Sequence, residues 1–316
     1  MAVVDPVEAL APTTAPPTAR PAGVGGWFSS LWEWLRADRR ARIAVGFLAL
    51  VLVAGLLAKL FAQDPLAQNL NVILKNPSTR HWFGTDDLGR DVFSRLLSGG
   101  LVSLRAASIA VGVALLIGVP AGLIAGFRGG IVDEIVMRCA DTVLAFPGLV
   151  LAVGVVAMLG PGLAKAMAAV GIVFAPSLAR LMRAQVLSVK EHLYVEAAVT
   201  FGSSAPQVIR RHIVPNAIQP IIVQTSLLFA LSLLAEAGLS FIGLGVQPPN
   251  PSWGSMLGRA YKYMRIAPFQ LVPPGVMVML TALAFNALGD SLRDELDPRR
   301  RKRRRRTAVT ETLPTP

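Results

Sequence analysis

The feature that most constrains this chain is a series of six long apolar runs that carry few charges. The hydrocarbon core of a bilayer is about 30 Å thick, so a helix needs about 20 mostly apolar residues to cross it. The runs cover residues 43–62, 101–127, 135–159, 166–186, 217–246 and 271–288. They are continuous rather than alternating, which favours helices over a β-barrel. We therefore expect an all-α, polytopic membrane protein with six transmembrane helices.

Composition and charge agree with this fold class. Of the 316 residues, 53% are hydrophobic and 16% are charged, which is too apolar a balance for a soluble domain of this length. The arginines also suggest an orientation. If both termini are cytoplasmic, most of the 31 Lys and Arg residues fall in or beside inside segments. The sequence therefore predicts that both ends lie in the cytoplasm.

The two ends of the chain are predicted to be cytoplasmic tails. In residues 1–42, Trp27, Leu31 and Trp34 recur at helical spacing before an arginine cluster. This pattern fits either an amphipathic helix at the membrane interface or the start of the first span. No cationic start leads into an apolar core, so no cleaved signal peptide is expected. Residues 292–316 carry a run of basic residues without interleaved aromatics, which favours contact with anionic lipid over nucleic acid.

Motifs for catalysis are missing from the sequence. The three histidines, His81, His192 and His212, have no companions at metal-ligand spacing, so we expect no metal site. No G-x-S-x-G, H-E-x-x-H or Cys-x-x-Cys motif occurs. No G-x-x-x-x-G-K-[ST] phosphate loop occurs either, so this chain should not hydrolyse ATP unaided. Transport, channel formation or a scaffold role remain.

A polar stretch, EAAVTFGSSAPQVIRRHIVPNA, interrupts the apolar runs on the predicted cytoplasmic side. Residues 188–201 can form a helix, and Gly202 permits the turn that ends it. Ser204, followed by a proline and a glutamine, predicts a second short helix that stops near Pro215. The residues alone leave two interpretations open. The stretch either docks into a groove of a partner or only joins two spans.

The predicted external loop, residues 63–100, contains a second helical pattern. Thr85 to Asp87 look like a helix start with acidic residues near its positive end. The apolar residues that then line one side are Leu88, Val92, Phe93, Leu96 and Leu97. We expect an amphipathic helix on the outer surface. It has either a structural role or serves as a landing site for a solute-binding protein.

Several residues inside the predicted core, residues 101–291, suggest packing or function. Gly118, Gly122 and Gly126 form G-x-x-x-G steps on one helical face, which predicts a close packing seam. Glu236 lies in the fifth run and Asp141 in the third, where ionisable groups are costly. Both are therefore candidates for a translocation path or gate, and the alternative for Glu236 is a hydrogen bond between helices. The prolines that fall within runs, as kinks or as tolerated bends, are Pro120, Pro147 and Pro176.

The residues Glu196-Ala197-Ala198, Gly202 and Ile213-Val214-Pro215 resemble the EAA loop of permease subunits in bacterial ABC importers. The resemblance covers roughly residues 80–299 and includes HWFGTDDLGRDVFSRLLSGG, VDEIVMRCADTVLAFPGLVLAV, LAEAGLSFIGLGVQPPNPSWGSML and LTALAFNALGDSLRDELDPR. These stretches are similar to the dipeptide/oligopeptide subunit of the peptide/nickel branch. Trp82, Thr200-Phe201 and Val214 depart from the family pattern.

The resemblance implies a type I importer permease fold in the bacterial cytoplasmic (inner) membrane. It also implies that residues 187–216 form a coupling segment, in which Glu196, Ala197, Ala198, Gly202 and Pro215 serve an ATPase partner. The expected partners are a homologous second permease, one or two ABC ATPase subunits that hold ATP and Mg, and an extracytoplasmic solute-binding protein. The chain would itself be a non-catalytic subunit without a cofactor.

Two alternatives remain beside an importer of di- or oligopeptides. The same class of machine could carry nickel, glutathione or another small solute. The distant alternative is a stand-alone secondary transporter, in which the EAA-like segment is incidental.

Overall fold

The computed structural model describes Arg36 and residues 38–296. The chain divides into two compact units, Met1–Asp38 and Arg39–Pro316, and the second unit contains every helix discussed below. The predicted interfacial helix around Trp27–Trp34 and the basic run at residues 299–306 lie outside the described residues.

The regular secondary structure in the described part of the second unit is helical, and no β-strand occurs in residues 38–296. The long helices are α2 (Arg39–Phe61), α3 (Val92–Arg128), α6 (Leu163–Lys190), α9 (Val214–Phe241) and α11 (Val272–Leu296). The shorter helices are α4 (Gly130–Leu144), α5 (Gly148–Leu159), α7 (Leu193–Thr200), α8 (Ala205–Val208) and α10 (Trp253–Lys262). Three further turns are η1 (Leu70–Val72), η2 (Ile209–Ile213) and η3 (Pro268–Leu271).

The helix lengths confirm an all-α, polytopic membrane protein. Within the described residues, five helices are long and apolar enough to cross a membrane, and a sixth crossing requires α4 and α5 to act as one bent span. The prediction of a continuous third span at residues 135–159 is wrong, because α4 and α5 meet at 91°. Pro147 stands at the N-cap of α5, and the residue before a proline resists helical geometry. The sequence run is therefore split where the proline falls.

The predicted external helix and second span are one helix, α3, of 37 residues. The helix begins after Asp91, whose carboxylate accepts the backbone N–H of Ser94 at 2.8 Å, and not at Thr85. Gly99 and Gly100 precede the predicted span but lie inside α3. A Cβ on Gly100 would stand 3.0 Å from the ring of Trp253, so the glycine admits that indole. The expected surface helix is thus the buried first part of a span.

The fifth span differs from its predicted limits at both ends. It ends at Phe241 rather than at residue 246, and Gly243, with φ of +85°, turns the chain away. The second short helix that the sequence predicts after Ser204 also does not stop near Pro215. A wide turn, η2, in which the N–H of Val214 bonds to the carbonyl of Ile209, leads into α9, where Pro215 occupies the first turn. The missing proline N–H costs nothing at such a position.

The glycine seam is confirmed between α3 and α6. A Cβ on Gly118 would lie 2.5 Å from the carbonyl oxygen of Ala175, and one on Gly122 would lie 2.2 Å from that of Ala179. Such distances require the two helix backbones to be in direct contact. Gly126 continues the seam against Val186, where the Cβ–Cβ distance would be 2.8 Å. Because no side chain separates the helices, α3 and α6 form one rigid pair.

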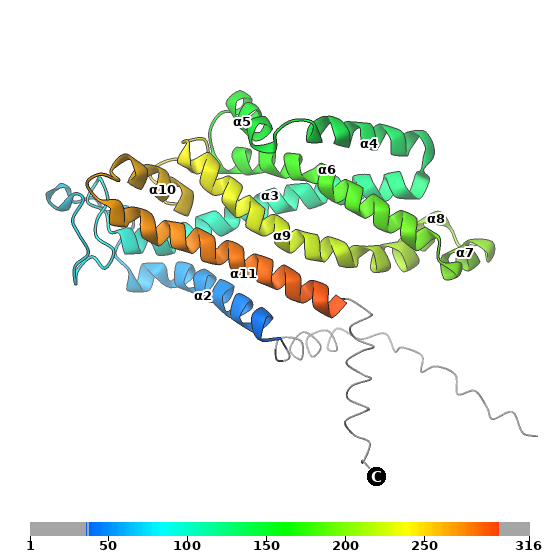
Figure 1. Ribbon diagram of the computed structural model, residues 1–316, viewed down its shortest axis with the longest axis horizontal. Coiled ribbons are helices and arrows are strands. Elements are labelled where there is room, and N and C mark those ends of the chain that lie inside the picture. The colour runs from blue at the N-terminus through cyan, green and yellow to red at the C-terminus, as the bar shows by residue number, and fades with distance from the viewer. Residues whose placement is uncertain (1–35, 37, 297–316) are drawn as a thin grey trace, which may run out of the picture. The chain divides into compact units, whose positions relative to one another are not determined.

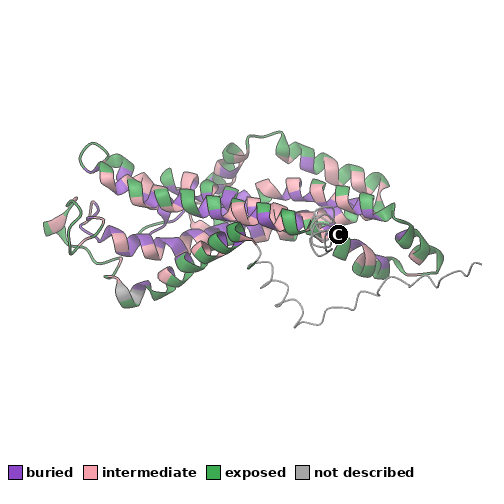
Figure 2. Cartoon of the chain, turned by 60° about the horizontal axis from the view of Figure 1, so that its bottom comes forward, coloured by how far each residue is buried: buried purple, intermediate pink, exposed green. Residues whose placement is uncertain are grey.

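Figure 1 shows how the long helices lie side by side. The α3–α6 pair and α9 share a core that includes Leu178, Met182 and Ile221. α2 and α11 pack together along one side, while α4 and α5 pack on α6 at another. Exposed residues follow the helices along much of their length, as Figure 2 shows in green. Many of these residues are large and apolar, as expected of helices that face lipid or another subunit.

Candidate functional site

The coupling segment forms a helix, a glycine turn and a second helix at one end of the bundle (Figure 1). α7 is separated from α6 by Glu191 and His192, so the predicted single helix over residues 188–201 is broken there. Gly202 ends α7 with φ of +80°, a conformation that favours glycine. The N–H of Gly202 bonds to the carbonyl of Val199 at 3.0 Å, and Ser203 bonds to Ala198 at 3.0 Å. The turn is therefore fixed by backbone bonds.

The predicted site residues of this segment lie at its surface. Glu196 and Ala197 are exposed, and Ala198 is half-buried. Ser204 occupies the N-cap of α8, as predicted, but its side chain makes no capping hydrogen bond. Thus Ala198 packs inward while Glu196 is free to meet a partner.

An exposed apolar rim beside Glu196 was missed by the sequence reasoning. Leu193 is 81% exposed and Phe201 is 88% exposed, while Val199 lies between them at 58%. Large apolar side chains with this exposure are typical of a surface that contacts a protein or a membrane. The signal was present in the sequence as the unexpected Thr200-Phe201 pair. We name the surface of Leu193, Glu196, Val199 and Phe201 the coupling face.

The coupling face is firmly attached to the core. Val195, Val208 and Ile213 are buried in the same cluster as Leu178 and Met182 of α6. Lys190, the last residue of α6, adds a second attachment. Its ammonium donates to the carbonyl of Phe127 at 3.0 Å, and lies 5.6 Å from the centre of that ring. A cation favours the carbonyl end of a helix, so Lys190 ties the end of α3 to the start of the coupling segment.

Glu236 is completely buried between α3, α9 and the start of α10. Its two carboxylate oxygens accept from the hydroxyls of Ser103, at 3.0 Å, and Ser240, at 2.7 Å. Each hydroxyl in turn accepts a backbone N–H, from Trp253 to Ser103 at 3.2 Å and from Val246 to Ser240 at 3.1 Å. Each serine hydroxyl therefore accepts one hydrogen bond from the backbone and donates its single proton to Glu236.

This arrangement makes Glu236 the centre of a network that joins three elements. The indole of Trp253 adds a bond to the carbonyl of Leu96 at 2.9 Å, which fixes α10 to α3. A carboxylate near the start of α10 is also favourable for the helix dipole. Glu236 lines no open surface in this structure, so its contacts are those of the interhelical hydrogen bond that the sequence left as an alternative.

Asp141 lies elsewhere, on an exposed part of α4. It forms an ion pair with Arg180 of α6, and Asp133 forms a second pair with Arg183. Half or more of both Asp141 and Arg180 is exposed, so that pair contributes little to stability. Asp141 and Glu236 contact different partners and do not form one site. Among the described residues, no group of His, Cys, Asp and Glu is arranged to hold a metal ion.

Five long helices that are apolar enough to cross a membrane define an integral membrane protein. The comparisons with known proteins then give the family. Residues 118–302 match the family described as "binding-protein-dependent transport system inner membrane component". The chain belongs to this family and is a permease subunit of an ABC importer.

Its relatives cover most of the chain. It is 38% identical over 295 residues to the dipeptide transport system permease protein DppC of Alkalihalophilus pseudofirmus, which spans 93% of this chain and 97% of that protein. It is 42% identical over 270 residues to the glutathione transport system permease protein GsiD of Pectobacterium atrosepticum, with coverage of 84% and 90%. A solved structure of the MetNI methionine ABC transporter in inward-facing conformations is 19% identical, with a TM-score of 0.48, over 63% of this chain and 97% of that chain.

Proposed function

We propose that this permease imports di- or oligopeptides and that its coupling face seats in a cleft of a separate ABC ATPase. The observation that carries the proposal is the coupling face, since Glu196 lies on a helix anchored to the core and Phe201, which directly follows that helix, is 88% exposed. ATP and Mg would be bound by one or two ABC ATPase subunits. This chain would form part of the translocation path and would transmit the movement of the ATPase subunits to it.

The other partners follow from the same proposal. A homologous second permease would complete the translocation path, and an extracytoplasmic solute-binding protein would deliver the cargo. The chain would lie in the bacterial cytoplasmic (inner) membrane, in contact with lipid, with both termini in the cytoplasm. The arginine distribution supports this orientation. The family is one of binding-protein-dependent transporters, which sets aside the stand-alone secondary transporter.

A second cargo, glutathione, is favoured by one observation. The GsiD relatives are named for glutathione transport and are as similar to this chain as the dipeptide relative is. Glutathione is itself a small peptide with free carboxylates, so both cargoes belong to one chemical class. Uptake of labelled dipeptide and of labelled glutathione, each competed by the other, would rank them.

The proposed gate residues act by different routes. Glu236 would hold α10 and the turn before it against α3 and α9, and would thereby position the outer end of the path. Asp141, paired with Arg180, would link α4 to α6 at the border of the path. Neither role requires contact with cargo. Labelled-cargo uptake by Glu236→Gln and Asp141→Asn at matched expression tests both, and wild-type uptake in a variant would remove that residue from the gate.

The coupling proposal is tested with two variants and a control. Glu196→Lys reverses the charge of the coupling face, and Gly202→Pro cannot adopt φ of +80°. Both should leave the chain in the membrane but lower uptake about tenfold or more, since one lost interface anchor costs on the order of 1.4 kcal/mol or more. Gln68→Lys makes a charge change at an exposed residue outside the coupling segment, so it is the control and should retain uptake.

The assays separate assembly from coupling. Purification in mild detergent shows whether an ATPase subunit accompanies each variant, and reconstituted vesicles give ATP hydrolysis and uptake from the same sample. Normal ATP hydrolysis with lost uptake supports uncoupling. Wild-type uptake in both Glu196→Lys and Gly202→Pro would refute the coupling role.

A further inference from the structure

A polar pocket with a volume of about 280 Å³ lies beside α10, at the end of the bundle opposite the coupling face (Figure 1). Its lining comes from four parts of the chain, of which the end of α9 is one. Asp87 belongs to the segment before α3, Gln247 and Asn250 belong to the turn after α9, and Arg259 and Lys262 belong to α10. None of these residues takes part in the coupling segment.

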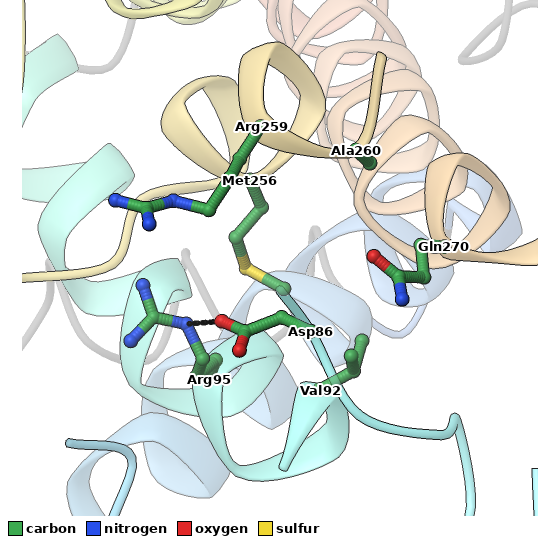
Figure 3. A pocket seen from close by; sticks show the side chains of 7 residues that line it. All are labelled: Asp86, Val92, Arg95, Met256, Arg259, Ala260 and Gln270. Atoms are coloured by element: carbon green, nitrogen blue, oxygen red, sulfur yellow. Dashed lines mark ion pairs between the residues drawn. The ribbon is translucent and has the colours of Figure 1, made fainter. Parts of the chain in front are cut away.

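The charges behind this pocket do not balance. Asp86 lies 2.7 Å from Arg90 and 3.4 Å from Arg95, and Asp87 lies 3.7 Å from Arg90 and 3.4 Å from Arg259. Figure 3 shows the Arg95–Asp86 pair with Arg259 close by on α10. Three arginines therefore share two carboxylates. Arg259 belongs to this charged group and also lines the pocket, so the group adds positive charge to the pocket wall.

Lys262 adds a second positive charge that no acid offsets. It follows Arg259 by three residues on α10, which places both side chains on one face of the helix. Lys262 is exposed and forms no ion pair or hydrogen bond with any residue that the structure describes. Residues 242–271 contain Arg259, Lys262 and Arg265 but no acidic residue at all. The pocket is thus suited to an anion.

The wall and floor of the pocket are fixed before any ligand arrives. The side-chain amide of Gln247 donates to the carbonyls of Gly243, at 3.0 Å, and Gly245, at 3.2 Å. Ser240, on the floor, accepts from Val246 and donates to Glu236. Groups held in this way lose little conformational freedom when a ligand binds, which favours affinity.

We propose that this pocket binds a carboxylate group between Arg259 and Lys262. A guanidinium matches a carboxylate in a forked pair, and an ammonium adds a second charge-assisted hydrogen bond. The carboxylate has two sources, the C-terminus of a peptide or an acidic side chain presented by a protein. The site does not depend on the coupling proposal, because it lies at the other end of the bundle and requires no ATPase.

The test is chemical footprinting of Lys262 in the purified full chain, together with any subunits that accompany it. An acetylating reagent modifies exposed lysines, and mass spectrometry gives the rate at each position. N-acetylglycylglycine carries a terminal carboxylate, while its C-terminal amide does not. Acetyl-Gly-Glu-Gly-amide carries only a side-chain carboxylate. All three probes lack a reactive amine, and sodium chloride matches the ionic strength.

A bound carboxylate should slow acetylation of Lys262 about twofold at the half-saturating concentration of the probe. The neutral amide should have no effect. Lys75 is also exposed but lies outside the pocket, so its rate should not change with any probe. Protection by N-acetylglycylglycine alone identifies a peptide terminus, and protection by the glutamyl probe identifies an acidic side chain. Equal rates at Lys262 with and without every carboxylate would overturn the proposal.

Two variants connect the protection to the pocket. Arg259→Gln removes one of the two cations, so the half-saturating concentration should rise several-fold. Arg265→Gln removes a neighbouring charge of the same segment that does not line the pocket, and should leave protection unchanged. Equal loss of protection in both variants would mean that the probes respond to the general charge of the surface, and this also would overturn the proposal.

Discussion

Replacement of Gly122 by alanine is expected to separate α3 from α6. The added Cβ would stand 2.2 Å from the carbonyl oxygen of Ala179 and 2.9 Å from the Cβ of Met182. Real Cβ atoms essentially never approach closer than 3.0 Å, so one backbone must move by about 0.8 Å. Neither neighbour is the end of a flexible side chain, so no local rotation relieves the clash. The helices themselves must shift.

Overpacking of this kind costs about 1–3 kcal/mol, against which alanine gains about 0.5–1 kcal/mol in helix propensity. The matched control is Gly112→Ala in the same helix, where nothing lies within 4 Å of the new Cβ. This control should be neutral or slightly more stable. Thermal unfolding in detergent measures both, and a shift of about 2–4 °C per kcal/mol is expected for a domain of 150–250 residues.

The result that would refute this reasoning is an equal melting temperature for Gly122→Ala and Gly112→Ala. It would mean that α3 and α6 are not in backbone contact.

Three further outcomes follow from the ion pairs and caps. Asp91→Ala removes the cap of α3 and should cost about 0.5–2 kcal/mol, while Asp91→Asn should retain most of the stability in the same melting assay. Glu236→Gln replaces a carboxylate with an amide, which has only one oxygen and cannot accept from both serines, so one buried hydroxyl loses its acceptor. The melting temperature should therefore fall by the equivalent of about 1–3 kcal/mol. An unchanged melting temperature would show that these hydrogen bonds do not stabilise the fold. The charge reversals Asp133→Arg and Arg183→Asp should each destabilise, and the double variant should recover at least half of the loss; strictly additive losses would show that this pair is not coupled.

The sequence predicted the parts of the fold that depend on hydrophobicity. Runs of about 20 apolar residues predicted the membrane helices, and the spacing of Gly118, Gly122 and Gly126 predicted their closest contact. It failed where a local signal competes with tertiary packing. The predicted external loop extended to residue 100, but α3 continues through Gly99 and Gly100, where Trp253, about 150 residues away, packs.

The candidate site shows the same division. The segment itself was enough to predict two short helices joined by a turn at Gly202, with Glu196 on the first of them. The partners of Glu236 could not, since Ser103 lies 133 residues away and only the fold brings it near. The apolar rim of the coupling face also required the structure, because a phenylalanine in a sequence gives no measure of its exposure. The carboxylate pocket depends on four segments and has no motif.

The direct contact of α3 with α6 also has a mechanical consequence. α6 ends where the coupling segment begins, and α3 runs for 37 residues, or about 55 Å at 1.5 Å per residue, back to the cap at Asp91. The glycines of the seam leave no room for one added carbon, so the two helices have little space to move relative to each other. We therefore expect a displacement at the end of α6 to move α3 together with it.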